Sequence, residues 1–251
     1  MPYLLLRVIT VFILLVSFMS KAEQQLNVVI GLAKPPYVVK EPLTGFEIEL
    51  VNHVFEKMNT SANYIFVPFG RTPRMLKNED IDAILTVNKQ VMPDEQLLTD
   101  VYINYQNVAI SLAKNNFEIN SIRELEQFTL ATFQNAHKIL GEAFADTVQK
   151  SPLYSQVANQ KIQLEMLFKE RAEVIIMDIN IFNHYLKSYE KNPLNQAFTV
   201  HEIFPPSAYR AAFKDTDNVM RFNKALATVL ESDEYRALVS KYQIVREHKK
   251  Q

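Results

Sequence analysis

The chain contains no cysteine and only four glycines among its 251 residues. Without cysteine, neither a disulfide nor a thiolate metal site can form, and a cysteine nucleophile or a cysteine-linked lipid anchor is excluded. Four glycines are too few and too scattered to make a phosphate-binding loop or a dinucleotide fingerprint. These absences remove several classes of enzyme before any other feature is considered.

An excess of charge of one sign is also missing. Lysine and arginine total 27, aspartate and glutamate total 28, and the pI is near 6.5. A nucleic-acid-binding or membrane-binding surface would need a basic cluster, which the sequence lacks. The five histidines form no H-x-x-x-H or H-E-x-x-H pattern, and no G-x-S-x-G occurs. We therefore expect no metal ion, no cofactor and no nucleic-acid partner.

The first 22 residues are typical of a secretory signal. Arg7 supplies positive charge, residues 8–19 form an apolar run of twelve, and Ser20 and Ala22 are the small residues that precede a cleavage site. A run of twelve is too short to span a bilayer, which takes ~20 apolar residues. The sequence predicts cleavage after Ala22 and a periplasmic protein. An uncleaved N-terminal anchor is the alternative.

Hydrophobic periodicity along the rest of the chain predicts strands that alternate with helices. Helix 46–58 is amphipathic, with Glu47 assigned to its polar face. The predicted strands are 26–32, 64–67, 81–85, 108–112, 128–132, 173–177 and 209–213, and the predicted helices are 46–58, 71–79, a short one from 121, 160–169, 179–187, 218–230 and 232–242. This order indicates an α/β protein with two βα units and mostly parallel sheets.

Four segments, taken in order, resemble one known family. They are Pro35-Pro36-Tyr37 followed by GFEIEL at 45–50, then DIDAI at 80–84, then EVIIMD at 173–178, and finally AAFKD at 211–215 with NKAL, SDEY and Lys241-Tyr242 after it. Together they resemble family 3 of the periplasmic solute-binding proteins, the amino-acid-binding type. The resemblance covers nearly all of the chain after the predicted signal.

This resemblance implies a type II periplasmic binding protein fold, in which two βα lobes enclose a ligand cleft and two hinge crossings join them. Lobe I is expected to hold residues 24–103 and 207–251, and lobe II residues 108–198. Residues 104–107 and 199–206 are the expected hinges. In such a fold the ends of strands and the starts of helices face the cleft.

The family also implies a function. We expect a monomer that captures a small polar ligand, an amino acid or a related compound, for an inner-membrane ABC permease. A ligand-sensing module for a membrane receptor is one alternative. A dehydratase-like enzyme on the same fold is another, and it would need an acid or base in the cleft. Only Glu173 and Asp178 are lobe II carboxyls that we place there, and Glu173 matches a structural position, so we expect no enzyme.

An amino-acid ligand needs an acceptor for its ammonium group and an aromatic lid. Asp178 is the expected ammonium partner because it stands at a strand-to-helix junction and matches that family position; a helix cap is the alternative role. Tyr37 and Phe69 are the aromatic candidates. Thr86 matches a position that offers a hydroxyl or main-chain group.

The partner of the ligand carboxylate departs from the family pattern. Common members carry S/T-x-x-x-R after the third strand, whereas residues 86–94 read TVNKQVMPD, so the arginine position falls on Met92 or near Asp94. The missing arginine therefore argues against the prediction of an α-amino acid as the ligand. The candidates that remain are Arg71 first, then Lys89, and then the backbone N–H groups of the turn that begins at Asn135, which is also expected to cap a helix.

Overall fold

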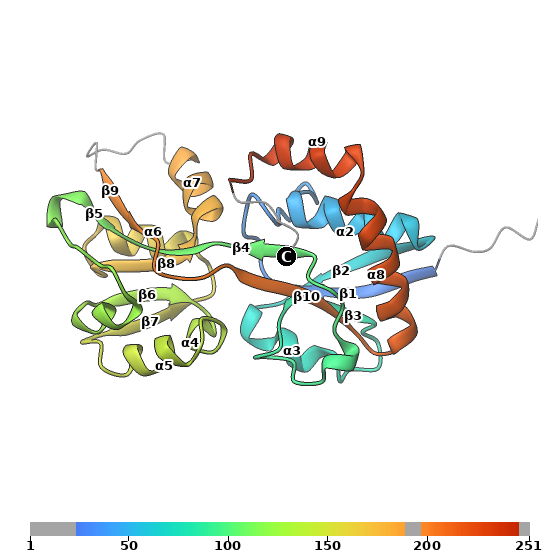
Figure 1. Ribbon diagram of the computed structural model, residues 1–251, viewed down its shortest axis with the longest axis horizontal. Helices are drawn as coiled ribbons and strands as arrows, with labels where there is room; N and C mark the ends of the chain where they lie inside the picture. Colours follow the sequence, from blue (N-terminus) through green and yellow to red (C-terminus); the bar gives the residue numbers. More distant parts are fainter. Residues whose placement is uncertain (1–23, 189–196, 246–251) are drawn as a thin grey trace, which may run out of the picture.

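The computed structural model describes residues 24–188 and 197–245. The predicted signal peptide, residues 1–22, lies outside the described residues. The described chain forms two five-stranded sheets, each flanked by helices (Figure 1). This architecture confirms the predicted α/β class with two lobes. None of the helices in these two ranges is long and apolar enough to cross a membrane.

The first sheet has the strand order β2-β1-β3-β10-β4. Its strands are β1 Gln24–Ile30, β2 Thr60–Phe66, β3 Ala83–Val87, β4 Ile103–Tyr105 and β10 Ser207–Phe213. The helices beside it are α2 Phe46–Lys57, η1 Phe69–Arg71, α3 Thr72–Met75, η2 Glu95–Leu97, α8 Thr216–Leu230 and α9 Asp233–Tyr242. The predicted helix 71–79 is therefore reduced to two short turns.

The second sheet has the order β7-β6-β8-β5-β9. Its strands are β5 Asn107–Leu112, β6 Leu130–Phe133, β7 Tyr154–Val157, β8 Val174–Asp178 and β9 Phe198–His201. The helices of this half are η3 Ala113–Asn115, η4 Ile122–Gln127, α4 Ala136–Ile139, α5 Glu142–Val148, α6 Lys161–Phe168 and α7 Ile179–Ser188. The sequence missed β4, β7, β9 and α5, all of which are short.

The prediction of mostly parallel sheets is wrong. In the first sheet β1 is parallel to β2 and β3, but β10 is antiparallel to both β3 and β4. In the second, β6 is parallel to β7 and β8, but β5 is antiparallel to β8 and β9. The antiparallel strands are those that arrive from the other sheet, so no βα crossover sets their direction.

Two chain segments pass between the sheets side by side. β4 ends at Tyr105 in the first sheet and β5 begins at Asn107 in the second, while the return passes from β9 to β10. Ser207 pairs with Tyr105 where the two crossings meet (Figure 1). That 104–107 and 199–206 act as hinges, and that the lobes divide at the predicted boundaries, stays a prediction.

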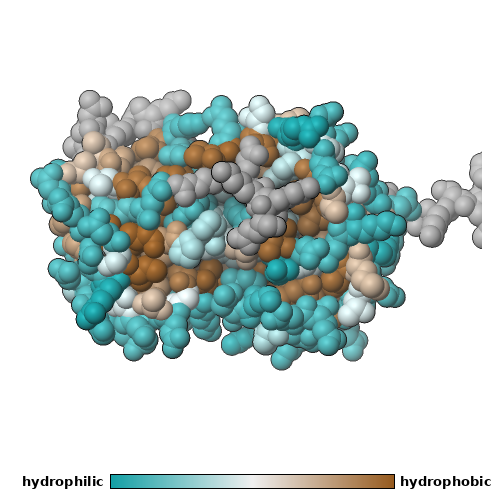
Figure 2. Space-filling view, viewed as in Figure 1, coloured by the Kyte–Doolittle hydropathy of each residue, from teal (hydrophilic) through white to brown (hydrophobic). Residues whose placement is uncertain are grey.

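Buried hydrophobic residues form one large cluster that extends through both halves of the molecule. Helix α2 packs into it through Ile48, Leu50, Val51 and Val54, all of which are fully buried. Hydrophilic residues cover most of the rim of the face in Figure 2, while hydrophobic residues show within each half. Packing of α2 against the first sheet fixes the start of this helix, which carries part of the site.

Gly45 sets the entry of α2. Its φ is +123°, in a region that L side chains rarely adopt, and a Cβ placed there would lie 2.3 Å from the Tyr37 carbonyl oxygen. Gly141 also has a positive φ, +92°, but a Cβ there meets nothing within 4 Å. A comparison of Gly45 with Gly141 therefore separates the effect of backbone strain from the effect of a collision with neighbouring backbone.

We predict that Gly45→Ala lowers the free energy of unfolding by on the order of 2–4 kcal/mol, because strain and collision add. Gly141→Ala, the matched control, suffers strain alone and should lose less. Urea unfolding of both variants followed by circular dichroism measures the difference. Equal losses would contradict the close approach of Gly45 to Tyr37.

Candidate ligand-binding site

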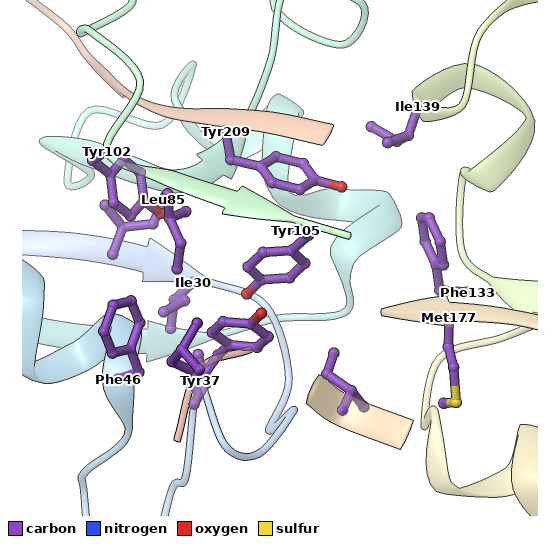
Figure 3. Packing of buried hydrophobic residues seen from close by; sticks show 14 of the residues in the cluster. Ile30, Tyr37, Phe46, Leu85, Tyr102, Tyr105, Phe133, Ile139, Met177 and Tyr209 are labelled. Atoms are coloured by element: carbon purple, nitrogen blue, oxygen red, sulfur yellow. The ribbon is translucent and has the colours of Figure 1, made fainter. Parts of the chain in front are cut away.

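A pocket lies between the two sheets. Its atom-free space, including the open mouth, is about 570 Å³. The first-sheet half contributes Gly31, Leu32, Ala33, Lys34, Phe69, Thr86, Tyr105 and Tyr209, and the second-sheet half Asn107, Phe133, Gln134, Ala158, Gln160, Asp178 and Ile181. Tyr105 and Tyr209 face Phe133 across this space (Figure 3).

The floor of the pocket in the first half is a cluster of polar side chains around Glu47. We call Glu47, Lys34, Thr86, Tyr102 and Tyr105 the Glu47 cluster. The fully buried Glu47 carboxylate accepts hydrogen bonds from Lys34 Nζ at 3.0 Å, Tyr105 OH at 2.8 Å, and the hydroxyls of Thr86 and Tyr102 at 2.5 Å. Lys34 Nζ also donates to Thr86 Oγ1 at 3.0 Å. The assignment of Glu47 to a polar helix face is therefore wrong.

The Glu47 carboxylate is held in its ionised form. Burial raises its pKa, but the nearby Lys34 charge and the three hydroxyl donors outweigh burial, so the pKa lies below the usual 4.5. The same negative charge, together with burial, raises the pKa of Tyr102 and Tyr105 well above 10, so both phenols stay protonated and donate. The cluster is thus electrically neutral as a unit.

Thr86 reaches the cluster through an irregularity in β3. The pairing between β3 and β10 shifts register between Ala212–Ile84 and Arg210–Val87, which leaves Leu85 and Thr86 opposite Ala211. Thr86 has φ +57°, a rare conformation for a β-branched residue and one that concentrates at functional sites. Its N–H donates to Tyr102 OH at 3.0 Å. The bulge therefore directs Thr86 toward Glu47 and the pocket.

Asp178 is the charged group of the other half. It ends β8, is 1% exposed and lines the pocket. Its Oδ1 accepts from the N–H groups of Asn180 at 2.8 Å and Ile181 at 3.1 Å, which caps α7, and its Oδ2 accepts from Gln106 N at 2.8 Å. Asp178 therefore both caps α7 and lines the pocket, which the sequence analysis allowed.

Burial raises the pKa of Asp178 to about 6, because the N–H groups of Ile181, Gln106 and Asn180 and the Tyr37 hydroxyl offset only part of the cost. Within residues 24–188 and 197–245, no cation forms an ion pair with it. Asp178 therefore carries a poorly compensated charge near neutral pH.

Tyr37 lies behind the pocket wall and does not line the pocket itself. Its ring stacks on Tyr105 with centroids 4.2 Å apart, and its hydroxyl bonds to Asp178 and accepts from Asn180 Nδ2 at 2.9 Å. Because Tyr37 belongs to the first half and Asp178 to the second, this contact links the two halves. Figure 3 shows Tyr37 beside Tyr105 at this junction.

The predicted site residues divide into two groups. Phe69, Thr86 and Asp178 line the pocket, with Tyr37 directly behind it. The three predicted partners for a carboxylate do not line it: Arg71 is exposed, Lys89 pairs with Glu95 at 2.6 Å on the surface, and Asn135 stands at the edge with φ +62°. Ligand contact by any of these residues stays a prediction.

Both positions where the family arginine would fall have structural roles. Met92 is 9% exposed and packs in the smaller hydrophobic cluster, and Asp94 caps η2 through Gln96 N. Asn135 does not cap α4 through its side chain as expected, because the residue itself is left-handed. The departure from the family pattern is therefore a real difference in the cleft.

Lys34 is the cation that sequence reasoning missed. It is the only basic residue among those that line the pocket in the described part of the chain. Its position one residue before Pro35-Pro36-Tyr37 was the available signal, because that motif follows a strand end that faces the cleft. Gln160, with an acceptor atom Oε1 that is buried and unpartnered, was also missed.

Comparison with known proteins identifies the class of protein to which the chain belongs. The family model of bacterial extracellular solute-binding proteins, family 3, matches residues 26–244, and the chain belongs to that family. It is similar to the arginine-binding periplasmic protein of Mannheimia haemolytica, with 21% identity over 93% of this chain and 97% of the relative.

Solved structures agree on the fold. An ancestral arginine-binding protein bound to arginine has a TM-score of 0.72 and 18% identity, and the match covers 88% of this chain and 98% of that one. A histidine kinase sensor domain similar to periplasmic binding proteins has a TM-score of 0.73 and 14% identity, covering 88% and 97%. The two-lobed periplasmic binding protein fold is therefore shown.

We predict that Lys34→Met destabilises the protein by about 3–5 kcal/mol, because it leaves the buried Glu47 carboxylate without its cation. The double variant Lys34→Met with Glu47→Gln removes both charges and should recover at least half of that loss. Chemical denaturation of the two variants and the parent measures this. A double variant as unstable as the single one would contradict the ion pair.

A second prediction concerns Asp178 and pH. Its pKa is about 6 in the folded chain against 3.8 normally, so its contribution to stability is greatest below pH 3.8 and is lost as pH rises through 6. Asp178→Asn removes this cost and should therefore gain about 2 kcal/mol relative to the parent between pH 4.5 and 7.5. Denaturation at both pH values, with the exposed Asp146→Asn as control, measures it. A pH-independent difference would contradict the raised pKa.

Proposed function

We propose that the chain is a periplasmic binding protein that captures a small polar ligand, an amino acid or a related compound, between its lobes. One observation carries this proposal: the buried Asp178 carboxylate lines an inter-lobe pocket and has no counter-ion there. A ligand ammonium would supply the missing charge. Membership of the solute-binding family and similarity to an arginine-binding periplasmic protein support it.

We further propose that the protein acts as a monomer and delivers its ligand to an inner-membrane ABC permease, with cleavage after Ala22. Bending at 104–107 and 199–206 would open the lobes, release the contact of Tyr37 with Asp178 and Asn180, and admit the ligand. Delivery to a membrane sensor would use the same capture step. The surfaces that face the partner differ between these two roles, while the pocket does not.

The pocket favours binding over catalysis. Acid–base chemistry needs a carboxyl group that is free to exchange a proton with the substrate. Glu47 is held by Lys34 and three hydroxyls, and Asp178 by three backbone N–H groups and Tyr37. Glu173 lies outside the pocket and accepts from Thr129 N at 2.8 Å and Thr129 Oγ1 at 3.0 Å. We therefore propose no reaction.

Thermal-shift and calorimetric screening against amino acids, amines and small carboxylates tests the proposal. A ligand at a hundredfold excess over its Kd adds ~2.7 kcal/mol and should raise the melting temperature by several degrees. Asp178→Asn should weaken binding of an amine-bearing ligand at least tenfold, because a charge-assisted bond is lost.

The exposed variant Asp146→Asn has the same change of charge and should bind as the parent does. If no compound in the panel shifts the melting temperature, the capture role is contradicted. If Asp178→Asn binds as tightly as the parent, Asp178 is not the ammonium partner.

A further inference from the structure

Among the described residues that line the pocket, the one carboxylate, Asp178, has no ion-pair partner, whereas the one cation, Lys34, is paired. A ligand carboxylate would need N–H or O–H donors, and the family arginine that normally provides them is absent from residues 86–94. The strongest of the remaining donors have described partners, and these partners are acceptors of the protein itself.

The donors of the first-sheet half are already engaged. Lys34 Nζ donates to Glu47 at 3.0 Å and to Thr86 Oγ1 at 3.0 Å, and its charge is cancelled by Glu47. The Thr86 N–H donates to Tyr102 OH, and the Tyr105 hydroxyl donates to Glu47. A ligand carboxylate would have to compete with a buried carboxylate for these groups.

Several donors of the second-sheet half, and Gly70 N opposite them, are engaged as well. Asn135 N donates to Gln156 Oε1 at 2.7 Å, and the His137 N–H donates to the Tyr154 hydroxyl. Asn107 Nδ2 donates to Ser207 Oγ at 3.0 Å. Gly70 N, at the mouth, donates to Gln134 Oε1 at 3.3 Å. Two of the N–H groups of the turn at Asn135 are thus already engaged.

Two acceptors of the pocket, in contrast, lack a compensating partner. Asp178 carries a negative charge without a cation, and Gln160 Oε1 is buried without any donor. With the Glu47 cluster neutral, the pocket has a net charge of −1. Phe69, Phe133, Tyr105 and Tyr209 surround it with aromatic surface, which attracts cations. The Tyr209 hydroxyl can donate or accept and suits either kind of ligand.

We infer that the ligand is a monocationic amine without an α-carboxylate, in contrast to a zwitterionic amino acid. The ammonium would bind Asp178 and Gln160 Oε1, and the remainder would lie against the aromatic side chains. This inference rests on the proposed capture function and narrows its ligand class. A zwitterion would match the amine at Asp178 but place its carboxylate in a pocket whose only basic lining residue among those described, Lys34, is already paired with Glu47, which costs affinity.

The test compares compounds that differ only in the carboxylate. The purified protein is titrated calorimetrically with histidine and histamine, phenylalanine and phenethylamine, and tyrosine and tyramine, because each of these amines is mainly a monocation near neutral pH. We expect the amine to bind at least tenfold more tightly than its amino acid in the pair that binds best. An amino acid that binds as tightly as its amine, or more tightly, overturns the inference and leaves the capture function intact. No binding in any pair overturns both.

A variant adds a second readout. Gln160→Leu removes the unpartnered acceptor and should weaken the bound amine about tenfold, as expected for one hydrogen bond to a charged group. Gln149→Leu, an exposed change of the same kind, serves as the control and should leave affinity unchanged. Unchanged affinity in a folded Gln160→Leu variant would overturn the role of Gln160 in ammonium binding.

Discussion

The hydrogen-bonded ion pair between Glu47 and Lys34 is the interaction on which the rest of the cleft depends. Glu47 joins the start of α2, the loop after β1, the bulge in β3 and the crossing strand β4 through one carboxylate. A fully buried charge is costly unless it is paired and hydrogen-bonded, and Glu47 meets both conditions. Because β4 leads directly into the second sheet, the same cluster fixes where the crossing starts.

This cluster also decides the electrostatics of the pocket. By neutralising Lys34, Glu47 removes the only pocket-lining cation of the described residues, and Asp178 is left as the dominant charge. The Tyr37 ring stacks on Tyr105, which donates to Glu47, and the Tyr37 hydroxyl bonds to Asp178. Tyr37 therefore connects the carboxylates of Glu47 and Asp178 across the two halves. If the lobes open as proposed, Tyr37 would separate from Asp178, and lobe closure would be coupled to the charge of the pocket. The cationic ligand proposed above would compensate the charge of Asp178.

The sequence was sufficient for the class of fold and for placing Phe69, Thr86 and Asp178 at the pocket, because each of them follows a short local motif, while their contact with a ligand stays a prediction. It was not sufficient for the Glu47 cluster. Helical periodicity assigned Glu47 to the solvent face, but two of its partners, Tyr102 and Tyr105, flank or end a three-residue strand that no periodicity reveals. Arg71 was favoured because the resemblance places the start of the helix after Phe69 on the cleft side, whereas Arg71 is exposed and does not line the pocket. Pairings over long separations in the chain decide the case of Glu47.

The measurement that tests this account most directly is a carbon-13 NMR titration of the side-chain carboxyl groups, with Glu47 and Asp178 assigned from Glu47→Gln and Asp178→Asn. We predict that Asp178 titrates near pH 6 and that Glu47 remains ionised to below pH 4.5. A Glu47 carboxyl that takes up a proton between pH 5 and 8, or an Asp178 that titrates at or below its normal 3.8, would contradict the account.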